Sequence, residues 1–192
     1  QSTSTVNQTG NGNGATVGQT GSDASTVDQT GNGNTAGVTQ SGTDGVSDIN
    51  QTGNNNTAFT TQETDGGNAV TDQLGNNNTS IIEQTDTSDL AGDPDALHTQ
   101  EGDSNFAQTG QESTSGAVDL SAVTTQTGNG NFSLVSQSAA GLDAGSLTAT
   151  VTQTTNGAVS VIEQNAAAPG VSDFTATVTQ TADSSSFINQ EG

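Results

Sequence analysis

The chain has no lysine, arginine or cysteine among its 192 residues, and it also lacks tryptophan and tyrosine. Without cations it cannot neutralise a phosphate backbone, which excludes nucleic-acid binding and disfavours anionic membrane surfaces. Without cysteine it has neither disulfides nor thiolate metal ligands. Only 27% of the residues are hydrophobic, which argues against a conventional packed core.

Long apolar runs are missing as well. No stretch approaches the roughly 20 apolar residues that cross a bilayer, so we expect no membrane insertion. The chain opens at Gln1 with neither Met nor an apolar signal region, and we expect a mature chain whose signal peptide has been removed. A composition with 21 acidic and few apolar residues is typical of disordered chains.

A strict repeat argues against disorder. Glutamine recurs every 10 or 11 residues up to Gln84, and then at spacings that alternate between 15 or 16 and 10 or 11. The registered residues are Gln8, Gln19, Gln29, Gln40, Gln51, Gln62, Gln73, Gln84, Gln100, Gln111, Gln126, Gln137, Gln153, Gln164, Gln180 and Gln190. Four residues before each stands Ala or Ser, and two before stands a β-branched residue, except at His98. Alternation with period two places all three on one face of a β-strand.

Glycine and asparagine between these strands, as in Thr9-Gly10-Asn11-Gly12, supply turns. Six residues before every second glutamine stand Asn13, Asn34, Asn56, Asn78, Asn105 and Asn131, so the period is two strands, about 22 residues. We predict an all-β, two-sheet β-solenoid of cross-β type, with about eight strand-turn-strand rungs that stack into a fibre. It forms one domain over residues 2–190, with short rungs over 2–84 and lengthened arcs over 85–190.

Units such as Gln8 to Gln19 read Gln-x-Gly-x-x-Asn-x-Ala-x-x-x-Gln, which resembles the curlin repeat of bacterial curli fibre subunits. Later rungs drift, with Ala158 and Ser184 where the pattern has Asn. The resemblance implies that the glutamines and asparagines are inward ladder residues. It also implies a secreted subunit that polymerises into functional amyloid at the cell surface or in the biofilm matrix. Its partners would be other copies of itself, a nucleator subunit and secretion factors.

The physics of stacking supports assembly. Rungs about 4.7–4.8 Å apart let glutamine amides hydrogen-bond along the stack. The first and last predicted strands carry no charge and no proline that would block another strand. We therefore expect head-to-tail polymerisation, with Ser4, Val6, Gln8, Ser186, Ile188 and Gln190 at the polymerisation ends. Repulsion among 21 carboxylates should slow it, so salt, divalent cations or acid should speed assembly.

Two apolar features depart from the simple repeat. Leu120, Leu147 and Phe174 each lie six residues before a glutamine, which predicts a strand extension in the last three rungs. An outward stripe is also predicted, either for lateral contact between filaments or for cover by the lengthened arcs. Its residues are Phe59, Ile81, Phe106, Phe132, Leu134, Val161 and Phe187.

The chain is not expected to be an enzyme or to hold a cofactor or metal ion. His98, the one histidine, takes an inward position opposite Thr109, and it has no Cys, Lys or Tyr to work with. We expect a buried neutral ring whose protonation near pH 6.5 weakens the rung. Acidic stretches such as residues 86–89 and 93–95 fit solvated loops better than calcium ligands.

A monomeric β-solenoid with an ice-binding or adhesin-like surface is the alternative to the fibre subunit. It rests on an outward row at Thr9, Thr20, Thr30 and Thr52, just after the glutamines. That row breaks at Glu63 and Leu74, and a monomer needs capped ends, so both features favour the fibre.

Overall fold

A computed structural model describes residues 1–87, 93–114, 119–140, 145–167, 170 and 173–192. This part of the chain contains fourteen β-strands and no helix. The strands are β1 (Thr3–Thr9), β2 (Gly14–Asn32), β3 (Thr35–Asn54), β4 (Thr57–Asp65), β5 (Asn68–Asn76), β6 (Thr79–Asp86), β7 (Asp95–Glu101), β8 (Phe106–Ser113), β9 (Leu120–Thr127), β10 (Phe132–Ala139), β11 (Leu147–Gln153), β12 (Val159–Ala166), β13 (Phe174–Gln180) and β14 (Ser185–Glu191). The predicted all-β class is confirmed.

The strands form two parallel stacks, which we call the first and the second sheet. β2 and β3 run unbroken round a corner, so each supplies one strand segment to both sheets. The first sheet holds β1, residues 24–32 and 46–54, β5, β7, β9, β11 and β13. The second holds residues 14–22 and 35–43, β4, β6, β8, β10, β12 and β14.

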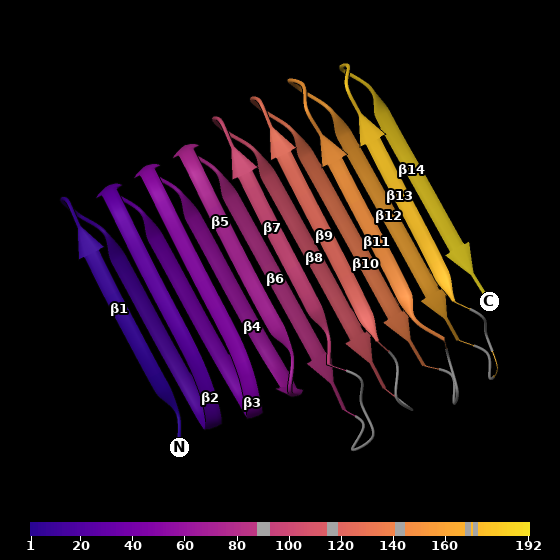
Figure 1. Ribbon diagram of the computed structural model, residues 1–192, viewed down its shortest axis with the longest axis horizontal. Coiled ribbons are helices and arrows are strands. Elements are labelled where there is room, and N and C mark those ends of the chain that lie inside the picture. The colour runs from indigo at the N-terminus through magenta and orange to yellow at the C-terminus, as the bar shows by residue number, and fades with distance from the viewer. Residues whose placement is uncertain (88–92, 115–118, 141–144, 168–169, 171–172) are drawn as a thin grey trace.

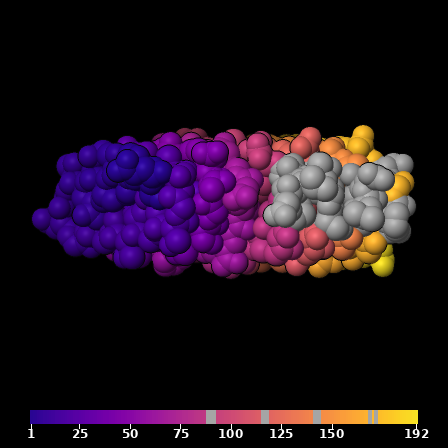
Figure 2. All heavy atoms as spheres, turned by 90° about the horizontal axis from the view of Figure 1, so that it is seen from below, coloured from indigo at the N-terminus to yellow at the C-terminus, as the bar shows by residue number. Residues whose placement is uncertain are grey.

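Eight segments in each sheet make the predicted β-solenoid of stacked rungs. The rungs advance steadily from the N-terminal to the C-terminal end (Figure 1), and seen from below the molecule is elongated and flat (Figure 2). Paired residues are 21 or 22 apart in the first four rungs, as between Gln8 and Gln29. They are 26 or 27 apart later, as between Gln153 and Gln180. The lengthened arcs that the sequence predicts fall largely on residues 88–92, 115–118, 141–144, 168–169 and 171–172, which lie outside the described residues.

The interior is one side chain deep on each sheet, because alternate residues of every strand point inward. Ala or Ser, a β-branched residue and Gln fill the inward positions of the inner rungs, and the buried apolar ones include Val27, Ile49, Ile82 and Val151. The predicted extension is also present, since Leu120 and Leu147 are buried with Ala139 and Ala166, and Phe174 packs against them. The last rungs therefore have a second apolar cluster beside the common core.

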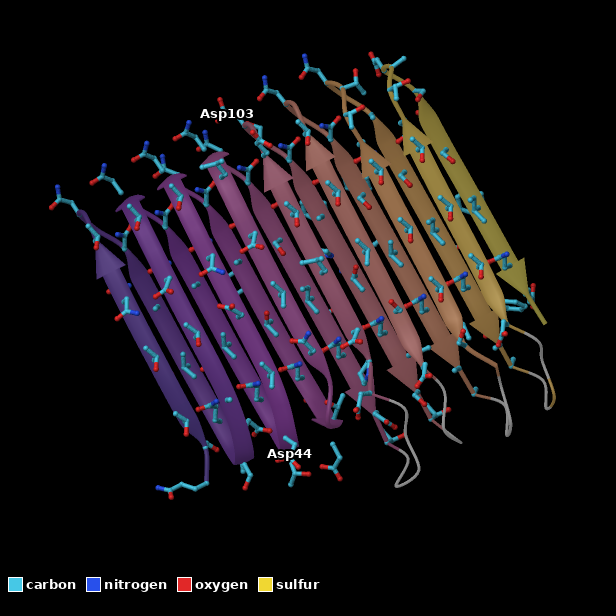
Figure 3. The ribbon with its side chains drawn as sticks, viewed as in Figure 1. Asp44 and Asp103 are labelled. Atoms are coloured by element: carbon cyan, nitrogen blue, oxygen red, sulfur yellow. The ribbon has the colours of Figure 1, made fainter. Side chains whose placement is uncertain are left out.

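Turn chemistry explains where the strands end. At the corner that leads from the first sheet to the second, one position has φ of +68° at Gly33, +56° at Asn55 and +59° at Ser104. Glycine and asparagine adopt this left-handed conformation at little cost. Asp103 lies at this corner and Asp44 at the opposite one, at the two ends of the strands (Figure 3).

Candidate functional site

Glutamine amides form two continuous ladders, one in each sheet. Along both, the Nε2 of each glutamine donates to the Oε1 of the glutamine on the next rung, at 2.7–2.9 Å, which gives fourteen bonds. Thirteen of the sixteen glutamines are at most 5% exposed. The other three, Gln8, Gln19 and Gln190, lie on the end rungs. The predicted glutamine ladders are thus present over the whole length.

A second set of bonds from the same amides ties the two sheets together. The other Nε2 hydrogen donates across the interior to the backbone carbonyl five residues before the facing glutamine, as from Gln51 to Thr35 and from Gln62 to Val46, both at 3.1 Å. Every glutamine except Gln8 makes such a bond. The sequence did not predict these crosswise bonds. They explain why glutamine, with two N–H groups on a long stem, holds this position.

The six predicted asparagines also form a ladder, but their side chains bond to backbone groups rather than to the next side chain. We call a series of equivalent residues on successive rungs a column. The Oδ1 of each asparagine accepts the backbone N–H of the residue in the same column on the next rung, as from Asn56 to Asn34 at 3.0 Å. The Nδ2 of each of the first five donates to the backbone carbonyl of the turn glycine on the next rung, as from Asn34 to Gly53 at 2.9 Å. The ladder ends where Asn131 accepts the N–H of Ala158. These side chains satisfy turn backbone groups that strand pairing leaves free.

Sequence analysis missed an exposed row of six asparagines and one aspartate at the same corner. The backbone N–H of each of the first six members donates to the side-chain Oδ1 of the member on the next rung, at 2.7–3.2 Å. The row is Asn11, Asn32, Asn54, Asn76, Asp103, Asn129 and Asn156. The sequence does contain a pattern that marks this row, because each member stands eight residues before a glutamine of the second sheet.

The two ends of the solenoid carry the predicted polymerisation residues. Ser4, Val6 and Gln8 lie on β1, and Ser186, Ile188 and Gln190 lie on β14. Each end rung pairs its backbone on one side only, because β1 pairs only with β2, and β14 only with β12. Val6 is therefore 44% exposed, although its position is buried on the second rung, at Val27. The end rungs display the residues that inner rungs bury.

The carboxylates are staggered along the stack. No carboxylate lies directly opposite another in the strand register of the described residues. In one outward column acids alternate with amides, and Asn50 Nδ2 donates to the Asp72 carboxylate at 2.9 Å. Burial, and then the charges of Asp72 and Asp28, raise the pKa of Asp48. A raised carboxyl pKa means that folding takes up a proton, so acid stabilises this stack through Asp48.

The predicted apolar stripe lies on the outer face of the second sheet. Phe59 and Phe187 are 45% and 64% exposed, and the Phe106 and Phe132 rings stack with centroids 5.0 Å apart. Val159, on the same face, extends the stripe beyond the prediction, whereas Gln108 interrupts it between Ile81 and Leu134. The stripe leaves apolar surface in contact with solvent.

His98 is buried, as predicted, inside a hydroxyl network. Its Nδ1 lies 2.8 Å from Ser80 Oγ, and its Nε2 lies 2.8 Å from Thr109 Oγ1. Burial lowers the pKa of His98 from 6.5 to about 3. The expectation that it protonates near pH 6.5 is therefore wrong for the folded chain, because the ring has no solvent to stabilise its charge.

The threonine row behind the alternative function needs a correction. Thr9, Thr30 and Thr52 are paired in one column of the first sheet, which Leu74 breaks. Thr20 lies on the second sheet, in the column that contains Glu63. Successive glutamines alternate between sheets, so the predicted single row is two rows on opposite faces.

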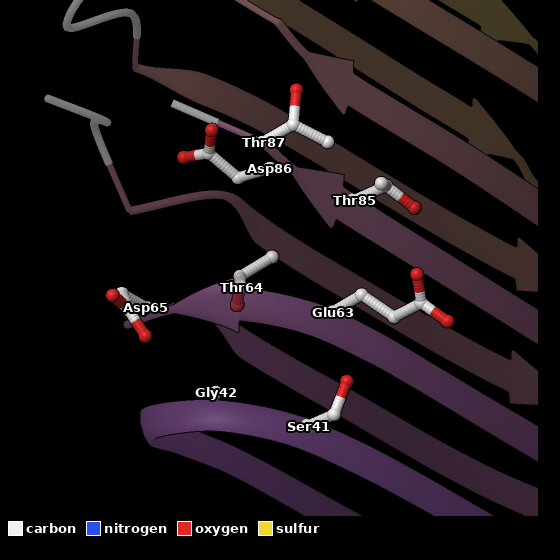
Figure 4. Close-up of a pocket in the computed structure, with 8 residues that line it drawn as sticks. All are labelled: Ser41, Gly42, Glu63, Thr64, Asp65, Thr85, Asp86 and Thr87. Carbon is white, nitrogen blue, oxygen red and sulfur yellow. The ribbon is translucent and has the colours of Figure 1, made fainter. Parts of the chain in front are cut away.

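A surface hollow of about 320 Å³ lies at the corner that leads from the second sheet back to the first (Figure 4). Its walls include Ser41, Thr64 and the acids Glu63, Asp65 and Asp86. Among the described residues no group of three or more His, Asp or Glu side chains is arranged to hold a metal ion. No helix in that part of the chain has the length and apolar character needed to cross a membrane.

Comparison of the chain with protein-family models, with curated proteins and with solved structures finds no match.

Proposed function

We propose that the chain is a secreted structural subunit that polymerises head-to-tail into an extracellular, curli-like amyloid fibre of the cell surface or biofilm matrix. The strongest support is the continuity of the columns across the two ends. Stacking β13 and β14 of one copy on β1 and the start of β2 of another would set Val178 on Val6 and Ile188 on Val17. Among the described residues, no strand pairs with the outer edge of either end.

The ends also match in charge. In that arrangement Glu191 would lie opposite Thr20 and Asn189 opposite Gly18, so the junction would keep carboxylates apart as the inner rungs do. Burying the exposed backbone and Val6 then supplies the free energy of association. The resemblance to the curlin repeat adds a nucleator subunit and secretion factors as expected partners.

Imaging the purified chain at low and at molar salt tests the proposal. We expect unbranched filaments with an axial repeat of about 4.7–4.8 Å, which appear sooner at high salt because screening weakens the repulsion among 21 carboxylates. Discrete monomers at both salt concentrations would overturn the proposal.

A matched pair of variants locates the junction. Val6→Asp puts a carboxylate on the inward face of β1 and should stop filament formation. Thr5→Asp adds the same charge on the outward face of the same strand, and should only slow assembly at low salt. Equal behaviour of the two variants would show that the β1 face is not the contact.

The apolar stripe is proposed as the lateral contact between filaments. Replacing both Phe132 and Leu134 by Ser should separate bundled filaments without stopping their growth, since neither side chain lies at a solenoid end. Electron microscopy would show single filaments of normal length. Persistent bundles would assign bundling to another face.

One observation favours the monomeric binding solenoid. The outer face of β11 and β13 carries uncharged pairs of threonines, in the pairs Thr148 with Thr175, Thr150 with Thr177 and Thr152 with Thr179. Such a regular hydroxyl surface suits an ordered ligand. Monomers that persist in the salt experiment would make this the leading function.

A further inference from the structure

Both glutamine ladders run in one direction. In every ladder bond the Nε2 donates toward the C-terminal end, from Gln8 to Gln29 at 2.7 Å in the first sheet and from Gln164 to Gln190 at 2.7 Å in the second. The N-terminal end therefore presents the acceptor oxygens of Gln8 and Gln19. The C-terminal end is the donor end.

The crosswise bonds fix this direction. Turning an amide over would place its Oε1 against the facing carbonyl oxygen, as at Gln62, whose Nε2 donates to the Val46 carbonyl at 3.1 Å. Two acceptors would then meet in a buried interior, at the cost of an unmade hydrogen bond for each. Reversing one ladder would require reversing all of its amides, so the ends of two copies match only as donor to acceptor.

At the donor end the two ladders differ. Gln190 Nε2 donates to the Thr175 carbonyl at 3.2 Å, and its second hydrogen has no acceptor among the described residues. Gln180 Nε2 donates to the carbonyls of Val159 and Ser184, both at 2.9 Å, so both of its hydrogens are used.

The length of the last turn accounts for the difference. Gln180 and Gln190 are 10 residues apart, whereas the corresponding pairs on the other rungs, such as Gln153 and Gln164, are 11 apart. The shorter turn brings the Ser184 carbonyl under the Gln180 amide. One ladder is therefore open to a new rung and the other is closed by its own chain.

Resting on the proposed function, we infer that an incoming copy docks first on the β14 side. There Gln190 Nε2 meets the Gln19 Oε1 of the second copy, while Ile188 packs on Val17. The β13 side closes in a second step, when Gln180 Nε2 leaves the Ser184 carbonyl for the Gln8 Oε1. The first contact sets the rate of addition, and the second sets how long the added copy stays.

Elongation of wild-type seeds by Gln190→Met and Gln180→Met copies tests the order. Each substitution removes one side-chain amide from the last rung and replaces glutamine by a residue of similar size. We expect Gln190→Met to lower the elongation rate constant about tenfold, the change that about 1.4 kcal/mol produces. Gln180→Met should leave that rate constant within about twofold and instead raise the critical concentration about tenfold. Thermal unfolding of the monomers checks that both variants fold.

A third variant should open the closed ladder. Inserting one glycine between Ala182 and Asp183 restores the 11-residue spacing and should free the Gln180 amide. We expect faster elongation than wild type and a rate constant that becomes sensitive to Gln180→Met.

The outcomes separate the two ideas. Equal losses of elongation rate in Gln190→Met and Gln180→Met would overturn the order of docking and leave the fibre intact. A larger loss in Gln180→Met would reverse the order. Failure of the wild-type chain to extend seeds or to form them would overturn the proposed function itself.

Discussion

The first four rungs and the last three stack in the same way but differ at the corner that leads from the second sheet back to the first. In the early rungs the corner between the sheets is narrow, with Asp23 and Gly45 at the position six before glutamine. Asp23 is buried there with Oδ1 accepting the Gly45 N–H at 3.2 Å and Oδ2 unpartnered. In the late rungs the same position holds Leu120 and Leu147, which are buried in an apolar cluster.

The difference shows that one repeat can stabilise its corners either by close backbone packing or by burying apolar side chains. The early corners depend on glycine, because the backbones of neighbouring rungs approach closely there. The later connections are longer in sequence, and Leu120 and Leu147 bury apolar area beside them. The glutamine ladders cross from one regime to the other without a break. Their bonds need only the rung spacing, which both corners keep.

The largest effect should come from filling a narrow corner. Gly42 has φ of +139°, and a Cβ there would overlap the Thr64 carbonyl oxygen, whereas the late rungs hold Ala139 and Ala166 in this column. We expect Gly42→Ala to lower the free energy of unfolding by more than about 4 kcal/mol. Gly110→Ala is the control, since its Cβ would meet no atom within 4 Å. Urea unfolding measures both, and similar losses would remove the distinction between the corners.

Next in size is the late apolar cluster. Leu147→Ala leaves a cavity beside Leu120 and Phe174, and should cost roughly 2–5 kcal/mol. Hydrogen exchange should rise in β9, β11 and β13 and stay low in the early rungs. Leu134→Ala removes the same atoms from a partly exposed position and should cost less. A loss at Leu134 as large as at Leu147 would contradict a separate buried cluster.

The rung formed by β7 and β8, which lies between the first four rungs and the last three, should respond to acid through His98. The pKa of His98 is about 3 in the folded chain, below the usual 6.5. As pH falls, the unfolded chain therefore binds a proton at His98 that the folded chain does not bind. Between pH 7 and pH 5 the wild type should lose about 2 kcal/mol more stability than His98→Val. The measurement is urea unfolding at both pH values. Parallel losses in the two proteins would mean that the ring gains a proton in the folded state.

The smallest effect should come from the charge stagger. Asn50→Asp places a carboxylate between Asp28 and Asp72 in one early column and should cost roughly 0.2–1 kcal/mol at low salt. Thr152→Asp adds the same charge in the late part of that column, between Thr125 and Thr179, and should cost less. Molar salt should erase the difference in thermal unfolding. A difference that survives molar salt would point to a cause other than charge.

Much of the fold could be predicted because the repeat alternates with period two. That period alone makes Gln29 and Ile49 inward and Phe59 outward, whatever the neighbours are. The extension at Leu120 and Leu147 was also visible, as an apolar residue at a fixed distance from glutamine. The candidate ends followed from the intact register of the first and last strands.

Other features depend on which groups meet in space. The crosswise bond of Gln51 reaches a carbonyl 16 residues back, on the facing sheet, and no local pattern marks that atom. Thr20 fell on the wrong row for the same reason, since the side of the solenoid is set by the corner between strands. Burial also determined the pKa of His98, which composition leaves at its ordinary value.

The sequence by itself therefore determined the strands, their inward faces and the order of the rungs, because side-chain alternation is a property of one strand. Only the tertiary structure decided the direction of the ladders, the bonds between the sheets and the closed state of the Gln180 amide. Those properties require a donor and an acceptor from different rungs or sheets to lie within hydrogen-bond distance, and folding alone brings them there.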